Sequence, residues 1–114
     1  MNPQQIMEVL IKAQNELSRL NENYKNFGIQ KEKAERTYRI ELRKKLIQLR
    51  AERVPSSIIQ DLAKGDERIS QLRLERGLAE NNYITCKEAM NNKRIEIDSL
   101  RSILTWQRVE LGNS

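Results

Sequence analysis

A seven-residue hydrophobic repeat runs through the second half of the chain. Between positions 69 and 111, thirteen positions follow one another at alternating steps of three and four, and ten of them are apolar. Random placement at 38% hydrophobic residues would put about five apolar residues there. Such a repeat predicts a long helix, over about 66–111, that buries one narrow stripe against another helix. The thirteen positions are Ile69, Leu72, Arg76, Ala79, Tyr83, Cys86, Met90, Lys93, Ile97, Leu100, Leu104, Gln107 and Leu111.

The first half carries a matching repeat. It begins at Ile6 and continues at steps of four and three as far as Phe27. Lys31 then occupies a position where an apolar residue is due, after which the stripe resumes with a local change of phase. Pro3 suits a first helical turn, where its missing N–H costs nothing. We therefore expect a first long helix over about 3–53.

The connector between the repeats contains the signals of a short third helix. Proline disfavours helical geometry in the residue before it, so Pro55 should end the first long helix. Ser56 or Ser57 is expected to cap a short helix over about 56–64. Asp66 is expected to cap the long helix that follows.

Two long helices joined by so short a connector pack most simply side by side in opposite directions. We therefore expect an all-α fold in which residues 1–114 form a single antiparallel coiled-coil hairpin, with the short helix over the turn. A turn centred near position 62 would place Tyr38 opposite Cys86, and Lys31 level with Lys93. Both lysine amines should then point outward, towards Glu35 or Glu96.

Apolar residues outside the two stripes exceed what a hairpin can bury. A large exposed apolar patch usually marks an interface with another protein chain. We therefore expect self-association into a helical bundle, with a dimer favoured. The candidate interface residues are Ile40, Ile47, Val54, Leu74, Ile103, Trp106 and Val109.

Residue types that carry out chemistry are scarce. Histidine is absent, which removes the commonest acid–base catalyst and metal ligand. Cys86 lies on the apolar repeat, where a buried structural thiol is expected and no nearby base would ionise it. No glycine-rich phosphate loop occurs. We expect no enzymatic activity, no cofactor, no metal site and no small-molecule ligand.

Positive charge is concentrated around the connector. The chain has a net charge of +5 from 21 basic and 16 acidic residues. Positions 31–76 hold thirteen of the bases and eight of the acids, which accounts for the whole excess. The simplest interpretation is a solvated surface on which ion pairs form between residues four apart, such as Glu32/Arg36 and Glu41/Lys45. The candidate basic strip for a partner consists of Arg36, Arg39, Arg43, Lys44, Arg50 and Arg53.

Three functions remain open for such a chain. The first is a protein-interaction module, an adaptor or inhibitor, whose basic strip binds an acidic protein. The second is a nucleic-acid-binding accessory protein, although exposed aromatic residues for base stacking are lacking. The third is a structural scaffold that only self-associates.

Targeting signals are also lacking. No apolar run approaches the ~20 residues that cross a bilayer. The first residues do not combine a basic region with an apolar core, as a secretory signal does. We expect a cytoplasmic protein without a membrane partner.

The connector from Pro55 to Gly65, followed by Arg73, Arg76 and the repeat up to Trp106, resembles small helical accessory proteins of phages and prophages of Gram-positive bacteria. The resemblance covers about half of the chain. It implies an accessory factor that binds a host or phage protein, or that assists recombination or replication. It assigns no site residue.

Overall fold

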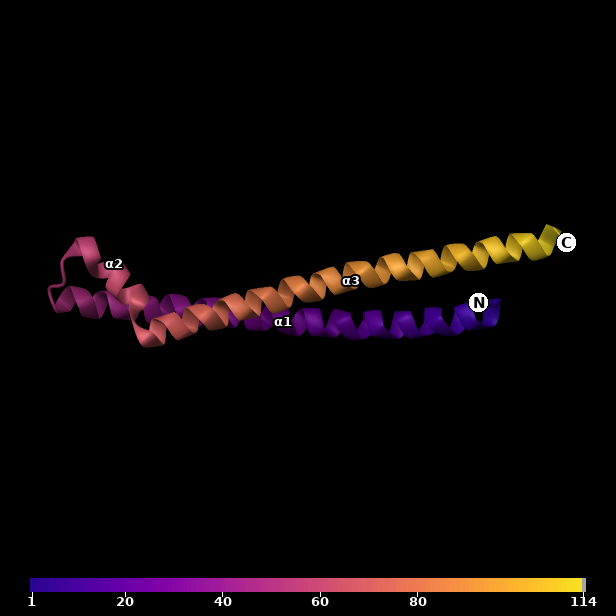
Figure 1. Ribbon diagram of the computed structural model, residues 1–114. Coiled ribbons are helices and arrows are strands. Elements are labelled where there is room, and N and C mark those ends of the chain that lie inside the picture. The colour runs from indigo at the N-terminus through magenta and orange to yellow at the C-terminus, as the bar shows by residue number, and fades with distance from the viewer. Residues whose placement is uncertain (114) are drawn as a thin grey trace. The chain divides into compact units, whose positions relative to one another are not determined.

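The computed structural model describes residues 1–113, and these residues form three α-helices and no β-strand. Helix α1 spans Pro3–Ala51, α2 spans Ser56–Gly65 and α3 spans Glu67–Asn113 (Figure 1). The predicted all-α fold is confirmed, and each boundary lies within two residues of its predicted position. Contacts divide the chain into two compact units, and α1 and α3 each contribute to both.

Helix α1 begins with a reciprocal cap. The Gln5 backbone N–H donates to Asn2 Oδ1 over 2.8 Å, and the Asn2 N–H donates to Gln5 Oε1 over 2.9 Å. Two backbone donors that the helix leaves unpaired are satisfied in this way.

The first unit consists of residues 1–25 and the described residues from 84 onward. Here α1 and α3 run antiparallel. Gln107 Nε2 donates to the Met1 carbonyl near one end, and the Cys86 thiol donates to the Leu20 carbonyl at the other. The buried core between these contacts is formed by Ile6, Leu10, Ala13, Ile97 and Leu100.

The second unit, residues 26–83, contains two buried clusters. Tyr38 packs on Ile69 and Leu72, which joins α1 to α3. Leu49 packs on Ile59 and Ala63, so that α2 is folded back beside the end of α1 (Figure 1). In this unit α2 therefore buries one face against α1.

Helix α1 ends in a Schellman motif. Arg53 adopts a left-handed conformation with φ of 64°, and its N–H donates to the Arg50 carbonyl over 3.0 Å. The Val54 N–H donates to the Leu49 carbonyl over 3.1 Å, and the Val54 side chain packs on the cluster around Leu49. Pro55 follows immediately and prevents the helix from continuing.

The caps of the other two helices differ in type. The predicted serine cap of α2 is wrong: Pro55 occupies the cap position, and no side chain donates to or accepts from the first turn there. Ser56 is already helical, because the fixed φ of Pro55 directs the chain into the helix. The predicted cap of α3 is confirmed, since the Ile69 N–H donates to Asp66 Oδ2 over 3.2 Å.

The predicted register is wrong by about two heptads. Tyr38 packs on Leu72 instead of Cys86. The cause is α2, which folds back over α1, so that α3 starts beside Lys45 and not beyond the end of α1. A slip by whole heptads keeps every apolar stripe facing the other, so the periodicity alone did not reveal it.

The predicted placement of Lys31 level with Lys93 is also wrong, whereas the predicted contact of Lys93 with Glu96 is confirmed. Lys93 Nζ donates to Glu16 Oε2 over 2.6 Å and to Glu96 Oε2 over 2.8 Å, within the first unit. Lys31 belongs to the second unit, where its amine lies 5.1 Å from the centre of the Tyr83 ring. Each lysine therefore has its own partners.

Candidate interaction surface

All six residues of the basic strip are exposed, but they differ in their partners. Arg39 Nε lies 2.6 Å from Glu35 Oε1, and Lys44 Nζ lies 3.5 Å from Glu41 Oε1. Within residues 1–113, the side chains of the other four form no ion pair. These four are Arg36, Arg43, Arg50 and Arg53.

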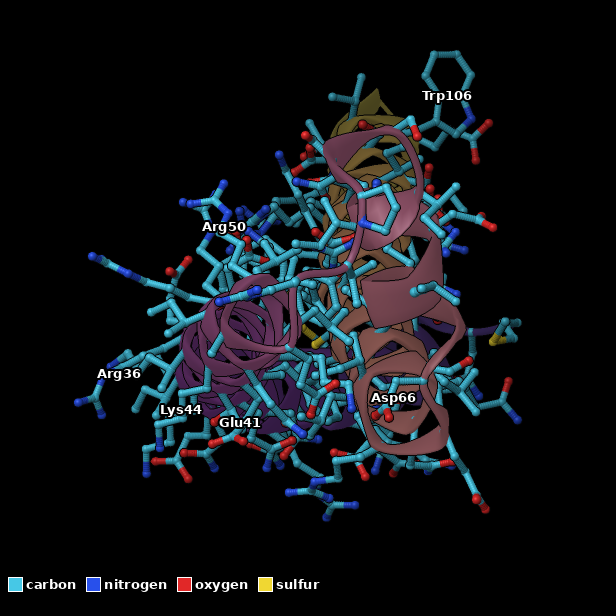
Figure 2. All side chains as sticks on the ribbon, turned by 90° about the vertical axis from the view of Figure 1, so that its left-hand side faces the viewer. Arg36, Glu41, Lys44, Arg50, Asp66 and Trp106 are labelled. Atoms are coloured by element: carbon cyan, nitrogen blue, oxygen red, sulfur yellow. The ribbon has the colours of Figure 1, made fainter. Side chains whose placement is uncertain are left out.

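Two of the neighbouring ion pairs expected from the sequence do not form. Glu32 lies 3.8 Å from Lys31 and not at Arg36. Lys45 leaves its own helix to reach Asp66, with 3.2 Å between Nζ and Oδ1. Arg36 therefore lacks the carboxylate partner that the sequence offered it. Figure 2 shows Arg36 and Arg50 extending from α1, whereas Lys44 lies beside Glu41.

Three of the unpaired arginines alternate with isoleucines. Arg36, Ile40, Arg43, Ile47 and Arg50 follow one another at steps of four and three, and we call this row the arginine–isoleucine stripe. Ile40 and Ile47 are 40% and 56% exposed. Both lie about 200° around the helix from the buried residues two positions away. The stripe therefore lies on the face of α1 opposite its core contacts.

A charged cluster joins the same segment of α1 to α3. Glu35 accepts from Arg39, and Arg76 Nε of α3 lies 3.6 Å from its other oxygen. The hydrogen bond from Arg39, helped by the charge of Arg76, holds the pKa of Glu35 below its usual value. The Arg76 guanidinium also stacks over the Tyr38 ring at 4.3 Å. These contacts join α1 to α3 within the segment that carries the stripe.

Ion pairs at two other places join α1 to the rest of the fold. The hydrogen bond from the Ile69 backbone, followed by that from Lys45, lowers the pKa of Asp66. In the first unit, hydrogen bonds to Glu16 and then Glu96 raise the pKa of Lys93, and the same contact lowers the pKa of Glu16. These charges stabilise the fold and lie outside the stripe.

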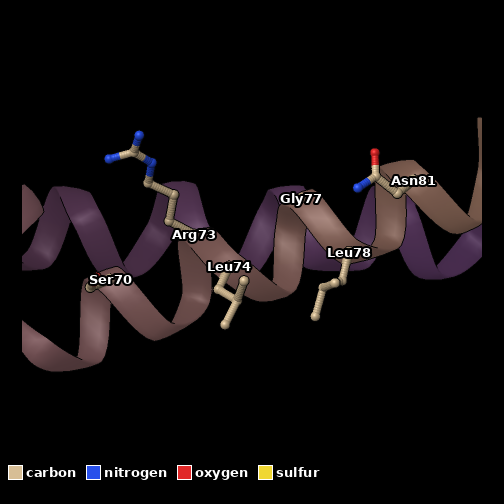
Figure 3. Close-up of a pocket in the computed structure, with 6 residues that line it drawn as sticks. All are labelled: Ser70, Arg73, Leu74, Gly77, Leu78 and Asn81. Atoms are coloured by element: carbon tan, nitrogen blue, oxygen red, sulfur yellow. The ribbon is translucent and has the colours of Figure 1, made fainter.

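The candidate interface residues are mostly exposed. Val54 is the exception, because it is half-buried against Leu49 and α2. Leu74 is more than half exposed and, together with Leu78, flanks Gly77 in a shallow depression on α3 (Figure 3). The remaining exposed candidates are Ile40, Ile47, Ile103, Trp106 and Val109.

Sequence reasoning missed a second set of basic residues. Arg94, Arg101 and Arg108 recur every seven residues along α3 in the first unit, and Lys87 continues the row. All are exposed. The spacing is visible in the sequence, but this part of the chain is neutral overall, and the net charge drew attention to positions 31–76.

Chemically reactive groups show no constellation in the part of the chain that is described. Cys86 is buried, with its sulfur 3.4 Å from the Leu20 carbonyl oxygen. Among residues 1–113, no three His, Cys, Asp or Glu side chains gather in an arrangement able to hold a metal ion. Over the same residues, no helix combines the length and hydrophobicity that crossing a bilayer requires.

Comparison with protein-family models, with curated proteins and with solved structures finds no match. What the chain does therefore has to be inferred from its own surfaces.

Proposed function

We propose that this protein is a non-enzymatic interaction module. In this proposal, α1 and α3 form one antiparallel coiled-coil hairpin with α2 packed at the turn. The hairpin holds an acidic protein through the arginine–isoleucine stripe and acts by occupying that protein's surface, as an adaptor or an inhibitor. This is the kind of role that the resemblance to phage accessory proteins implies.

The proposal rests on the exposure of Arg36, Arg43 and Arg50 and on their lack of an ion-pair partner. All three are exposed and unpaired within residues 1–113, although acids are plentiful on the same helix. They recur at about 10.5 Å along one face. Such a row offers three bidentate donors to carboxylates at matching spacing.

The isoleucines favour a protein over a nucleic acid. Ile40 and Ile47 lie between the arginines and are exposed. A phosphate backbone offers them no apolar surface, whereas a helix with an apolar stripe and acidic flanks covers both residue types together. Burial of the two side chains then adds to the electrostatic attraction.

The test is affinity capture from lysate with matched variants. The variant Arg36→Glu/Arg43→Glu/Arg50→Glu should lose the captured protein, and Ile40→Ser/Ile47→Ser should weaken its capture. A control variant, Arg19→Glu/Lys25→Glu/Lys87→Glu, changes the net charge equally and should retain it. If all three variants retain the same proteins, the stripe is not the binding surface.

Nucleic-acid binding is the second candidate, and the unpaired arginine row is the observation in its favour. It predicts retention on DNA that falls steeply with added salt and is lost in the arginine variant. It also predicts that Ile40→Ser/Ile47→Ser has no effect on retention. These retention results would show that the stripe binds a phosphate backbone and not an acidic protein. A pure scaffold would bind neither.

We also propose that the hairpin self-associates, with a dimer as the simplest state. The support is the number of large apolar side chains that the described chain leaves exposed, Ile103 and Trp106 among them. Sedimentation equilibrium tests this: the chain should show a mass above 13.4 kDa. In the variant Ile103→Ser/Trp106→Ser the mass should return to that of one chain.

A further inference from the structure

One flank of the first unit carries two depressions between α1 and α3, of about 320 Å³ and 230 Å³. We call these two depressions together the groove. Several lining residues of the two depressions are related by seven residues, Met7 and Gln14 on α1 and Ile97 and Leu104 on α3 among them, so both depressions open on the same flank. A row of small depressions suits successive side chains of a helix better than one small molecule. On α1 the groove is lined by Met7, Gln14 and Ser18, and on α3 by Leu104 and Leu111.

The two rims of the groove differ in charge. The α3 rim carries Arg94, Arg101 and Arg108 at seven-residue intervals. Within residues 1–113, the side chains of Arg101 and Arg108 pair with no carboxylate, and Arg94 donates only to Asn91. Asp98 is the one acid that lines the depressions. The α1 rim is uncharged.

We infer that this groove is a second interaction surface, for an α-helix with an apolar stripe and carboxylates along one flank only. Met7 is exposed and Leu104 half-buried, so a partner's apolar stripe has side chains to cover. Carboxylates seven residues apart on the partner match the arginine rim, which spans about 21 Å. The inference is independent of the arginine–isoleucine stripe, which belongs to the other unit.

A second copy of the chain does not fit this groove as a symmetric partner. A twofold interface brings the same surface of each copy together, so it must be self-complementary. Here the arginine rim would meet another arginine rim or the uncharged α1 rim, and only Asp98 would offset the charge. The charge of the arginine rim therefore favours a helix of different, acidic sequence over a symmetric second copy.

The inference is tested with a synthetic probe. The probe is a fluorescent helical peptide of about three heptads, with leucines along one stripe and glutamates seven residues apart on one flank. We expect saturable anisotropy in the micromolar range, whereas a peptide with lysines in place of the glutamates does not bind. Arg94→Glu/Arg101→Glu/Arg108→Glu should weaken binding by about tenfold or more. Met7→Ser should also weaken binding.

Two controls keep the result specific. The variant Lys64→Glu/Arg68→Glu/Arg73→Glu changes the net charge equally at exposed positions of the other unit, outside the arginine–isoleucine stripe, so it should leave the peptide affinity unchanged. The lysine peptide should bind the variant Arg94→Glu/Arg101→Glu/Arg108→Glu, which shows that the variant is folded and that the charges meet. The inference fails if neither peptide binds, if both bind the wild-type chain equally, or if Lys64→Glu/Arg68→Glu/Arg73→Glu weakens binding as much as Arg94→Glu/Arg101→Glu/Arg108→Glu does.

Discussion

Lys45 Nζ lies 3.2 Å from Asp66 Oδ1, so the last part of α1 is joined to the residue that caps α3. The twenty residues between them include all of α2, which packs on Leu49. This pair therefore marks where α3 begins alongside α1 in the second unit. Substitutions in this pair therefore test the register of α3 against α1.

Substitutions of Asp66 separate its cap from its ion pair. Asp66→Asn retains a capping oxygen but loses the charge opposite Lys45, whereas Asp66→Ala loses both. The melting temperature at neutral pH should therefore fall in the order wild type, Asp66→Asn, Asp66→Ala. Thermal unfolding followed by circular dichroism measures this order.

The pH dependence of the same pair follows from the lowered pKa of Asp66. A carboxyl whose pKa is lower in the folded state adds stability above its unfolded pKa, near 3.8, and loses it as the pH falls through the folded value. The melting-temperature difference between wild type and Asp66→Asn should thus be full at neutral pH and shrink as the pH falls below 3.8. A constant difference would show that the charge of Asp66 contributes nothing.

Arg53→Gly should stabilise the protein by about 1 kcal/mol. Arg53 holds a left-handed φ of 64° in the motif that ends α1, a conformation that glycine adopts without steric cost. Chemical denaturation measures the change. Arg50→Gly, at a helical position of the same segment, should instead destabilise by about 1 kcal/mol. Destabilisation by Arg53→Gly would mean that the Arg53 side chain forms contacts that outweigh the strain.

Ile59→Ala should lower the free energy of unfolding by about 2–4 kcal/mol, because Ile59 of α2 is buried against Leu49 of α1. Its neighbour Ile58 is 46% exposed and serves as the control, with an expected cost below about 1 kcal/mol for Ile58→Ala. Denaturant titration compares the two. Equal costs would indicate that α2 does not pack on α1 through the face described.

Gly77→Ala should stabilise an isolated chain by about 1 kcal/mol, since a Cβ there meets no atom within 4 Å. Gly112→Ala, in the last turn of α3, should have a smaller effect, because helix ends fray. Denaturation at low protein concentration tests both. If Gly77→Ala instead destabilises and lowers the oligomer mass, another helix packs against the depression of Figure 3.

Local signals in the sequence predicted the helices well. The two heptad repeats, Pro55 and Asp66 placed the ends of all three elements within two residues. These features act through neighbouring residues, so the sequence carries them directly. The failed serine cap is a local error: Ser56 was one residue too late, because Pro55 itself occupies the cap position.

The register of α1 against α3 and one surface could not be predicted from neighbouring residues in the sequence. Tyr38 meets Leu72 because α2 folds back on α1, and a repeat of seven residues fits equally well after a slip of two heptads. The row Arg94, Arg101 and Arg108 was overlooked because net charge averages over a segment. Only the structure shows that these arginines line the depressions between α1 and α3.

The most direct test of the account is the register in which α1 meets α3. Cys86 is the single cysteine, and its sulfur lies 3.4 Å from the Leu20 carbonyl oxygen. Under mild oxidation, Leu20→Cys should form a disulfide with Cys86 within one chain, detected by mass spectrometry, while Tyr38→Cys should leave both thiols free. Closure of the disulfide in Tyr38→Cys, with none in Leu20→Cys, would contradict the account.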